Sequence, residues 1–204
     1  NGVTYRLVTD STGNTALTNG PFQIDSSTGV VTVRDGSLLD YETATSATVY
    51  VEASSADGST AVQNFTVQIT DKNDNIPVLT SGTTGSVAEN AATTTVLYDV
   101  NAADADGSSA NNTLTYSLKG DGSTDDAEFV AIDATTGEVT LKASANYEAK
   151  TNYTFTVVAT DNGSPSLSSE KIVTVSVTDV DEFDVSTPVD TNGSSNSVQE
   201  GSTA

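Results

Sequence analysis

The feature that most constrains the fold of this chain is an internal repeat of about 108 residues. Residues 22–33 recur as residues 129–141, and the identities at an offset of 108 include Ile24, Asp25, Thr28, Gly29 and Val31. Residues 66–71 recur as residues 174–179 at the same offset. A period of this length is the size of one β-sandwich domain and is too long for a solenoid repeat.

The phase of the repeat divides the 204 residues into three parts. We expect residues 1–76 to be a truncated repeat that lacks its first strand, and residues 77–182 to be a complete repeat. Residues 183–204 would supply the opening strand of a further repeat, so the chain resembles a window on a longer tandem array. For this tail we expect either a frayed segment or a strand that pairs with the first unit of a neighbouring chain.

Within each unit, apolar and polar residues alternate. Val173, Val175 and Val177 are separated by polar residues, and residues 153–159 show the same period of two. This alternation predicts half-buried strands, and Asn-Gly, Asp-Gly and Thr-Gly turn signals separate the runs. No amphipathic helical stretch stands out. The predicted fold class is therefore all-β, with tandem seven-stranded Greek-key β-sandwiches of the immunoglobulin-like type.

Composition excludes several classes of function. There are 28 acidic and 7 basic residues, which gives a net charge of −21, and the chain contains no histidine or cysteine. Nucleic acids and anionic membrane surfaces require clustered basic residues, so we expect neither as a direct partner. Ser-His-Asp and Cys-His catalysis, the usual zinc sites and disulfides are excluded. Oxygen ligands remain, and these suit hard cations such as calcium and magnesium.

The acids gather where strands are expected to end. Five clusters stand out, at residues 39–42, 71–75, 104–107, 161–163 and 179–182. Asp-X-Asp spacing places two carboxylates on one side of an extended loop, and calcium takes 6–8 oxygen ligands. Any single Asp-Gly or Asn-Gly is more often just a turn. Paired carboxylates also occur in glycosidases, but no pocket-forming insertion or tryptophan accompanies them, so we expect no enzyme.

The order and spacing of these motifs resemble a cadherin repeat, nearly end to end over residues 77–182. The matching motifs are the opening strand with its glutamate, the Asp-X-Asp loop, the Phe-X-Ile-Asp…Thr-Gly hairpin and the Ala-X-Asp-X-Gly-X-Pro turn, at residues 87–90, 104–106, 129–139 and 159–165. In the first unit, residues 39–42 are similar to the family's Leu-Asp-X-Glu motif. Residues 71–77 are similar to its Asp-X-Asn-Asp-Asn-X-Pro motif.

The resemblance implies up to three calcium ions at the boundary between the two repeats. The implied side-chain ligands are Asp40, Glu42, Asn73, Asp74, Asp104, Asp106 and Asp161. Backbone carbonyls of Lys72, Asn75 and Asn111 would complete the set. The carboxylates among these residues would repel one another in a small volume, and three divalent cations would balance their six negative charges.

A weaker second site is implied at the far end of the complete repeat. Its residues would be Glu89, Asn146, Glu148, Val180, Asp181 and Glu182. Asn146 stands where Asp40 stands in the first unit, and Asp181 and Glu182 replace the Asn73-Asp74 pair. The other half of this site would lie beyond Ala204.

These features predict an extracellular or cell-surface module that binds calcium and acts as a calcium-rigidified extender in cell adhesion. The threonine-rich, acidic, cysteine-free composition resembles bacterial cadherin-like arrays in large, membrane-associated adhesins. Expected partners are neighbouring repeats of the same protein, other cadherin-like chains or polysaccharide. The alternative is a calcium-dependent carbohydrate-binding module. Sugar sites usually present exposed aromatics, whereas most tyrosines here sit in repeat motifs and Tyr98 alone is left unexplained.

Overall fold

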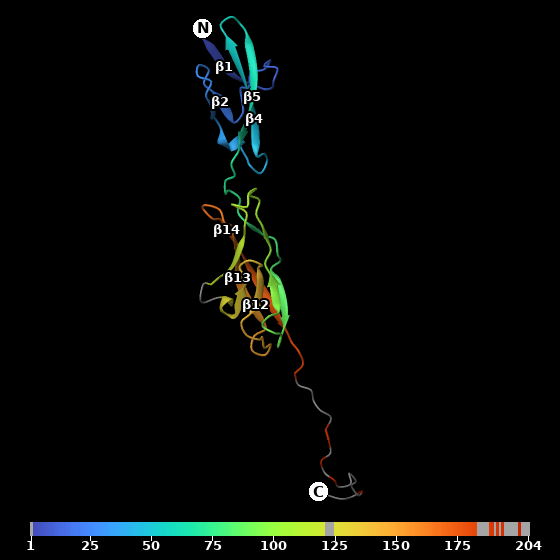
Figure 1. Ribbon diagram of the computed structural model, residues 1–204. Coiled ribbons are helices and arrows are strands. Elements are labelled where there is room, and N and C mark those ends of the chain that lie inside the picture. The colour runs from blue at the N-terminus through green and yellow to red at the C-terminus, as the bar shows by residue number, and fades with distance from the viewer. Residues whose placement is uncertain are drawn as a thin grey trace.

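Two β-rich units lie end to end in a computed structural model of the chain (Figure 1). The structure describes residues 2–120 and 125–182, together with residues 188, 189, 191, 193 and 200. In these residues no sheet combines strands from both sides of residue 76. None of the described segments forms a helix with the length and apolar character needed to span a membrane.

The first unit is built from one three-stranded sheet and one hairpin. The sheet has the order β1-β4-β5, with β1 (Val3–Val8), β4 (Ser46–Ser55) and β5 (Thr60–Gln68) all antiparallel. The hairpin pairs β2 (Phe22–Ile24) with β3 (Val31–Val33), and a short 3-10 helix, η1 (Gly36–Leu38), follows. The small core of the first unit is formed by Leu7, Phe22 and Val49.

The second unit is a sandwich of a four-stranded and a three-stranded sheet. The larger sheet has the order β10-β13-β14-β7, formed by β10 (Thr115–Lys119), β13 (Asn152–Thr160), β14 (Ser168–Thr178) and β7 (Thr84–Ala88). The smaller sheet has the order β11-β12-β8, formed by β11 (Val130–Ile132), β12 (Glu138–Leu141) and β8 (Val96–Asp99). Outside these sheets lie the pair β6 (Val78–Leu79) and β9 (Ala102–Ala103) and the 3-10 helix η2 (Ala127–Phe129). This architecture confirms the all-β sandwich class.

One strand pairing in the second unit is parallel. β7 runs parallel to β14, with Val87 opposite Val177, and covers an edge of that strand. In the first unit β5 corresponds to β14. Residues 2–76 contain no counterpart of β7 and none of β8. The first unit therefore lacks two strands that close the sandwich in the second.

The difference in strands is visible in the cores. Phe155 is 0% exposed in the second unit and packs edge-on against the ring of Tyr98, with 6.4 Å between the ring centroids. The hydroxyl of Tyr98 donates to the carbonyl of Gly82 at 2.5 Å, so its polar end is satisfied. Tyr98 is thus a core residue, which explains the one tyrosine that the sequence motifs left open. Phe65 on β5 is 54% exposed, because no strand covers it in residues 2–76.

The predicted opening strand of a further repeat, at residues 197–200, lies almost wholly outside the described residues. Strand donation by this tail therefore stays a prediction.

The two phenylalanines give a matched test of where the chain stores its stability. Phe155→Ala should lower the free energy of unfolding of the second unit by about 3–5 kcal/mol, because it leaves a cavity in a closed core. Phe65→Ala should cost about 1 kcal/mol, since half of that ring already contacts water. Chemical denaturation of the two variants beside the parent chain measures both values. Equal losses would contradict the described packing.

Candidate metal centre between the two units

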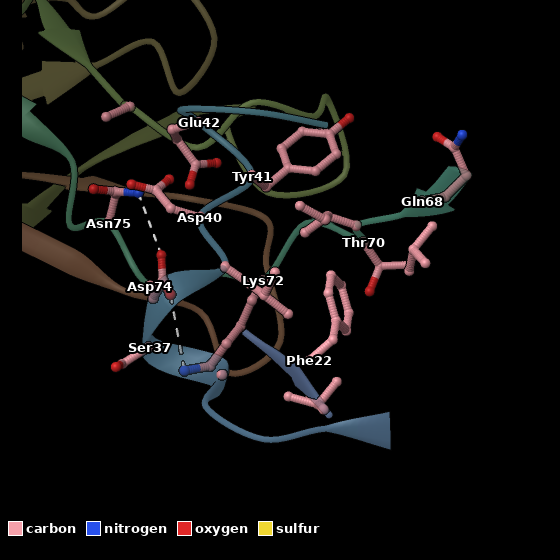
Figure 2. Close-up of a pocket in the computed structure, with 16 residues that line it drawn as sticks. Phe22, Ser37, Asp40, Tyr41, Glu42, Gln68, Thr70, Lys72, Asp74 and Asn75 are labelled. Atoms are coloured by element: carbon pink, nitrogen blue, oxygen red, sulfur yellow. Dashed lines mark hydrogen bonds and ion pairs between the residues drawn. The ribbon is translucent and has the colours of Figure 1, made fainter. Parts of the chain in front are cut away.

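Four segments meet where the first unit adjoins the second. They are residues 39–45 after η1, residues 69–77 after β5, residues 104–114 after β9 and residues 161–167 after β13. Each segment follows the end of a strand or short helix. Loops therefore gather at the ends of each unit, and these four lie at the ends that face each other. A cavity of about 820 Å³ lies beside them, with Asp40, Glu42 and Asp74 towards one end and Phe22 and Gln68 towards the other (Figure 2).

A first group of three carboxylates spans the two units. Glu42, Asp71 and Asp106 each place one carboxylate oxygen within 4.8 Å of the other two. Glu42 Oε1 accepts the backbone N–H of Gly107 at 3.0 Å, and Asp71 Oδ2 accepts the backbone N–H of Ser108 at 3.0 Å. The first unit and the linker thus bring their acids directly onto a loop of the second unit.

A second group lies deeper, within the second unit. Asp104, Asp106 and Asp161 also have carboxylate oxygens within 4.8 Å of one another, and Asp106 is only 2% exposed. Asp106 Oδ1 accepts the backbone N–H of Asn75 at 3.2 Å and its side-chain Nδ2–H at 2.9 Å. Asp106 therefore belongs to both groups, and it also holds the linker.

Several buried oxygen atoms at this junction have no hydrogen-bond donor. They are Asp71 Oδ1, Asn73 Oδ1, Asp104 Oδ2 and Asp106 Oδ2. A buried acceptor without a partner costs free energy, and clustered carboxylates add repulsion. All four atoms are hard oxygen ligands from the two units and the linker, and calcium takes 6–8 ligands of this kind. The residues present therefore fit a hard divalent cation.

Neighbouring acids in the first group have opposite pKa shifts. The pKa of Glu42 is raised, mainly because its carboxylate loses hydration where the units meet, with a further contribution from Asp71. The pKa of Asp71 is lowered, chiefly because it accepts a hydrogen bond from the Ser108 hydroxyl, and the side chain of Asn111 adds a second donor at 2.9 Å. Donors thus stabilise the Asp71 anion, whereas the N–H of Gly107 does not offset the lost hydration of Glu42.

The structure brings most of the predicted ligands to the junction, but not into one cluster. Glu42, Asp104, Asp106 and Asp161 lie in the two groups. Asn73 is buried beside them and donates through Nδ2 to Asp161 Oδ2 at 3.2 Å. The placement of Asn73 leaves its Oδ1 among the unpartnered acceptors.

Two predicted carboxylate ligands lie outside the two groups. Asp40 accepts the backbone N–H of Thr43 at 3.1 Å and its hydroxyl at 2.8 Å, so it closes its own turn. Asp74 has a half-exposed side chain, 3.9 Å from Lys72 Nζ. Metal ligation by these two carboxylates, and by the carbonyls of Lys72, Asn75 and Asn111, stays a prediction.

Asp71 is a candidate ligand that was not among the predicted site residues. It opens the same Asp-Lys-Asn-Asp-Asn segment as Asn73 and Asp74, and its repeat partner Asp179 occupies the same position 108 residues later. That repetition was the available signal. Only the fold showed that Asp71 faces Glu42 and Asp106 across the junction.

The far pole of the second unit carries a third group of acids. Glu89, Glu148 and Glu182 have carboxylate oxygens within 4.8 Å of one another, and Glu89 is 2% exposed. Glu89 accepts backbone N–H groups from Tyr147 at 2.9 Å and Val180 at 2.7 Å. Its pKa is lowered, with these two backbone donors as the main causes.

The remaining members of the predicted second site are arranged differently. Asn146 Oδ1 accepts the backbone N–H of Ala149 at 2.8 Å and so caps its own turn. Glu182 accepts a hydrogen bond from the side chain of Asn90. Asp179 has a raised pKa, first because of burial and then because of Glu89, Asp181 and Glu182. This pole is therefore strongly anionic and partly satisfied by the unit's own donors.

Two β-sandwich units joined end to end through a shared acidic junction define a tandem repeat of the extracellular adhesion type. A model of the cadherin domain family matches residues 83–178, and these residues belong to that family. Cadherin domains are adhesion modules rather than enzymes.

Known proteins resemble the chain over most of its length. It is 36% identical over 185 residues to human protocadherin Fat 1, a match that covers 88% of this chain and 4% of that protein. Mouse protocadherin Fat 4 is 40% identical over 125 residues, which is 60% of this chain and 2% of that protein. The crystal structure of mouse cadherin-23 EC22-24 superposes with a TM-score of 0.69 at 30% identity, covering 87% of this chain and 54% of that one.

The chain thus spans only a small part of the curated relatives it matches. These relatives are extracellular cadherin-domain proteins, which confirms the predicted location. They come from animals, and nothing in the comparisons supports the bacterial source or the carbohydrate-binding alternative suggested by the sequence.

Not every acid that recurs in both repeats lies at the junction. Asp133 accepts the backbone N–H groups of Thr135 at 2.8 Å and Thr136 at 2.9 Å, and its pKa is lowered by these hydrogen bonds. Asp25 makes the same bonds in the first unit. Both aspartates shape the hairpin turn that precedes a glycine with positive φ, Gly29 or Gly137.

The lowered pKa of Asp133 predicts a pH-dependent stability. Because its folded-state pKa lies below the ordinary value of 3.8, its contribution is complete above that pH and is lost as the pH falls further. Asp133→Asn keeps an oxygen acceptor for both N–H groups but removes the titration. The melting temperature of the parent should fall more steeply than that of the variant as the pH falls from about 4 to about 2. Parallel melting curves across this range would contradict the assignment.

Proposed function

We propose that the junction binds calcium and holds the two units as a rigid extender within a larger extracellular adhesion protein. The observation that carries this proposal is the set of four buried oxygen atoms that lack donors where both units meet. Coordination would satisfy these atoms and neutralise the surrounding carboxylates together.

Up to three ions would occupy the junction. The two carboxylate groups that share Asp106 support two positions, one between the units and one within the second unit. Asp71 joins the predicted ligands in the first position. An ion held by Glu42 and Asp71 on one side and Asp106 on the other would tie the first unit to the second. Without the ion, the same charges would push the units apart.

The far pole of the second unit would form a weaker site for a following repeat. Its group of Glu89, Glu148 and Glu182 is anionic, but Glu89 already accepts two backbone donors. Neighbouring repeats are therefore the first partners that we propose, with other cadherin-like chains beyond them. A solved structure of protocadherin gammaB7 EC3-6 is a cis-dimer, at 28% identity and a TM-score of 0.70. We assign the chain a structural role and no catalytic one.

Calcium should raise stability and reduce bending between the units. An ion that binds only the folded state stabilises it by about 2.7 kcal/mol for each site at a hundred times its Kd. Chelation with EGTA should lower the melting temperature and broaden the distribution of shapes in small-angle X-ray scattering. Magnesium at the same concentration is the control for ionic strength. The proposal is wrong if EGTA changes neither quantity.

Two isosteric substitutions separate ligation from turn formation. Asp106→Asn should weaken calcium binding at least about tenfold, a loss of about 1.4 kcal/mol, because both carboxylate groups share this residue. Asp133→Asn removes the same charge from a hairpin turn and should leave calcium binding unchanged. Isothermal titration calorimetry on both variants measures the difference. Identical titrations would count against the ligand assignment.

A further inference from the structure

Two glycines of the second unit lie against side chains from the first unit and the linker. They are Gly107 and Gly163, and neither is among the glycines with positive φ. Their backbone conformations therefore do not require glycine. Space does, because a Cβ added at either position would overlap a side chain from across the junction.

At Gly107 the neighbouring group is an aromatic ring. A Cβ there would lie 2.7 Å from Cε1 and 2.8 Å from Cδ1 of Tyr41. Both distances are shorter than the ordinary contact distance of 3.4–4 Å. The backbone N–H of Gly107 also donates to Glu42 at 3.0 Å, so the loop is held from two adjacent residues. The ring of Tyr41 offers no carboxylate, and its contact with the backbone needs no metal ion.

At Gly163 the neighbouring group is the side-chain amide of Asn73 in the linker. An added Cβ would overlap that amide, whose Nδ2 donates to the carbonyl of Pro165 at 2.7 Å. The amide therefore sits in a notch that only a glycine leaves open. The contact is 56 residues away along the chain from the one at Gly107. The contact of Tyr41 joins the two units directly, and that of Asn73 fixes the linker against the second unit.

We propose that these contacts form a metal-independent seat that sets the angle between the units, with Tyr41 and Gly107 as its positioning residues. The inference goes beyond the proposed function, because the seat acts without metal and selects the orientation that calcium would then rigidify. The Tyr-Glu pair of the seat recurs in the second unit: Tyr147 and Glu148 follow Tyr41 and Glu42 at an offset of 106. In the described residues, Tyr147 is partly buried and packs against the core of its own unit.

The absence of cysteine from the chain makes the angle measurable. Thr66→Cys and Ser117→Cys, at exposed positions on β5 and β10, accept one spin label in each unit. Pulsed electron paramagnetic resonance then gives the distribution of distances between the units in saturating calcium. Tyr41→Ala should broaden this distribution and shift its mean, whereas Tyr41→Phe keeps the ring and should reproduce the parent.

Substitutions at glycine test the other half of the contact. Gly107→Ala should shift the mean distance, because the ring must retreat from the new methyl group. Gly82→Ala is the matched control, since nothing lies within 4 Å of its added Cβ. In a Tyr41→Ala background, Gly107→Ala should add no further shift, because the clash requires the ring. Circular dichroism establishes that each variant keeps its sheets.

The outcomes distinguish the seat from calcium binding. If Tyr41→Ala and Gly107→Ala match the parent in calcium, the seat is overturned, even where EGTA broadens the parent distribution. If Gly107→Ala causes the same shift with and without the ring, the seat is also overturned. If EGTA leaves the parent unchanged while Tyr41→Ala broadens it, the calcium proposal fails and the seat stands.

Discussion

The carboxylate of Asp106 is the interaction on which the junction depends. It is almost completely buried, it belongs to both carboxylate groups, and it accepts hydrogen bonds from the linker through Asn75. A buried anion surrounded by other anions is costly unless donors or cations compensate it. Linker donors satisfy one oxygen of Asp106, while the other has no donor. The chain's own donors therefore satisfy only one of the two carboxylate oxygens of Asp106.

The sandwich of the second unit holds the loops that carry these acids. The parallel pairing of β7 with β14 closes one sheet, and the fully buried Phe155 and its neighbours fill the space between the two sheets. A closed core of this kind resists deformation, so loops attached to its strands keep their positions. The first unit has fewer strands in the described residues, but its β4 and β5 still present Glu42 and Asp71 at the facing pole.

Charge and shape act differently at the junction. Coulombic attraction to a cation falls off gradually with distance and has little directional preference, whereas steric contact is short-ranged and sets a limit on approach. Acids such as Glu42 and Asp71 would supply the attraction. The close approach of Tyr41 to Gly107 would supply the limit. Neighbouring residues in one Leu-Asp-Tyr-Glu motif thus contribute both effects.

The sequence by itself determined the repeat, the all-β class and the pole at which the acids gather, because strand alternation and turn residues are local signals. It did not determine which acids meet. Asp40 and Asp71 both sit in motifs that resemble those of the cadherin family. Asp40 nevertheless closes its own turn, whereas Asp71 faces Asp106. Such outcomes depend on which donors and strands reach a residue from distant parts of the chain, and only the tertiary structure decides that.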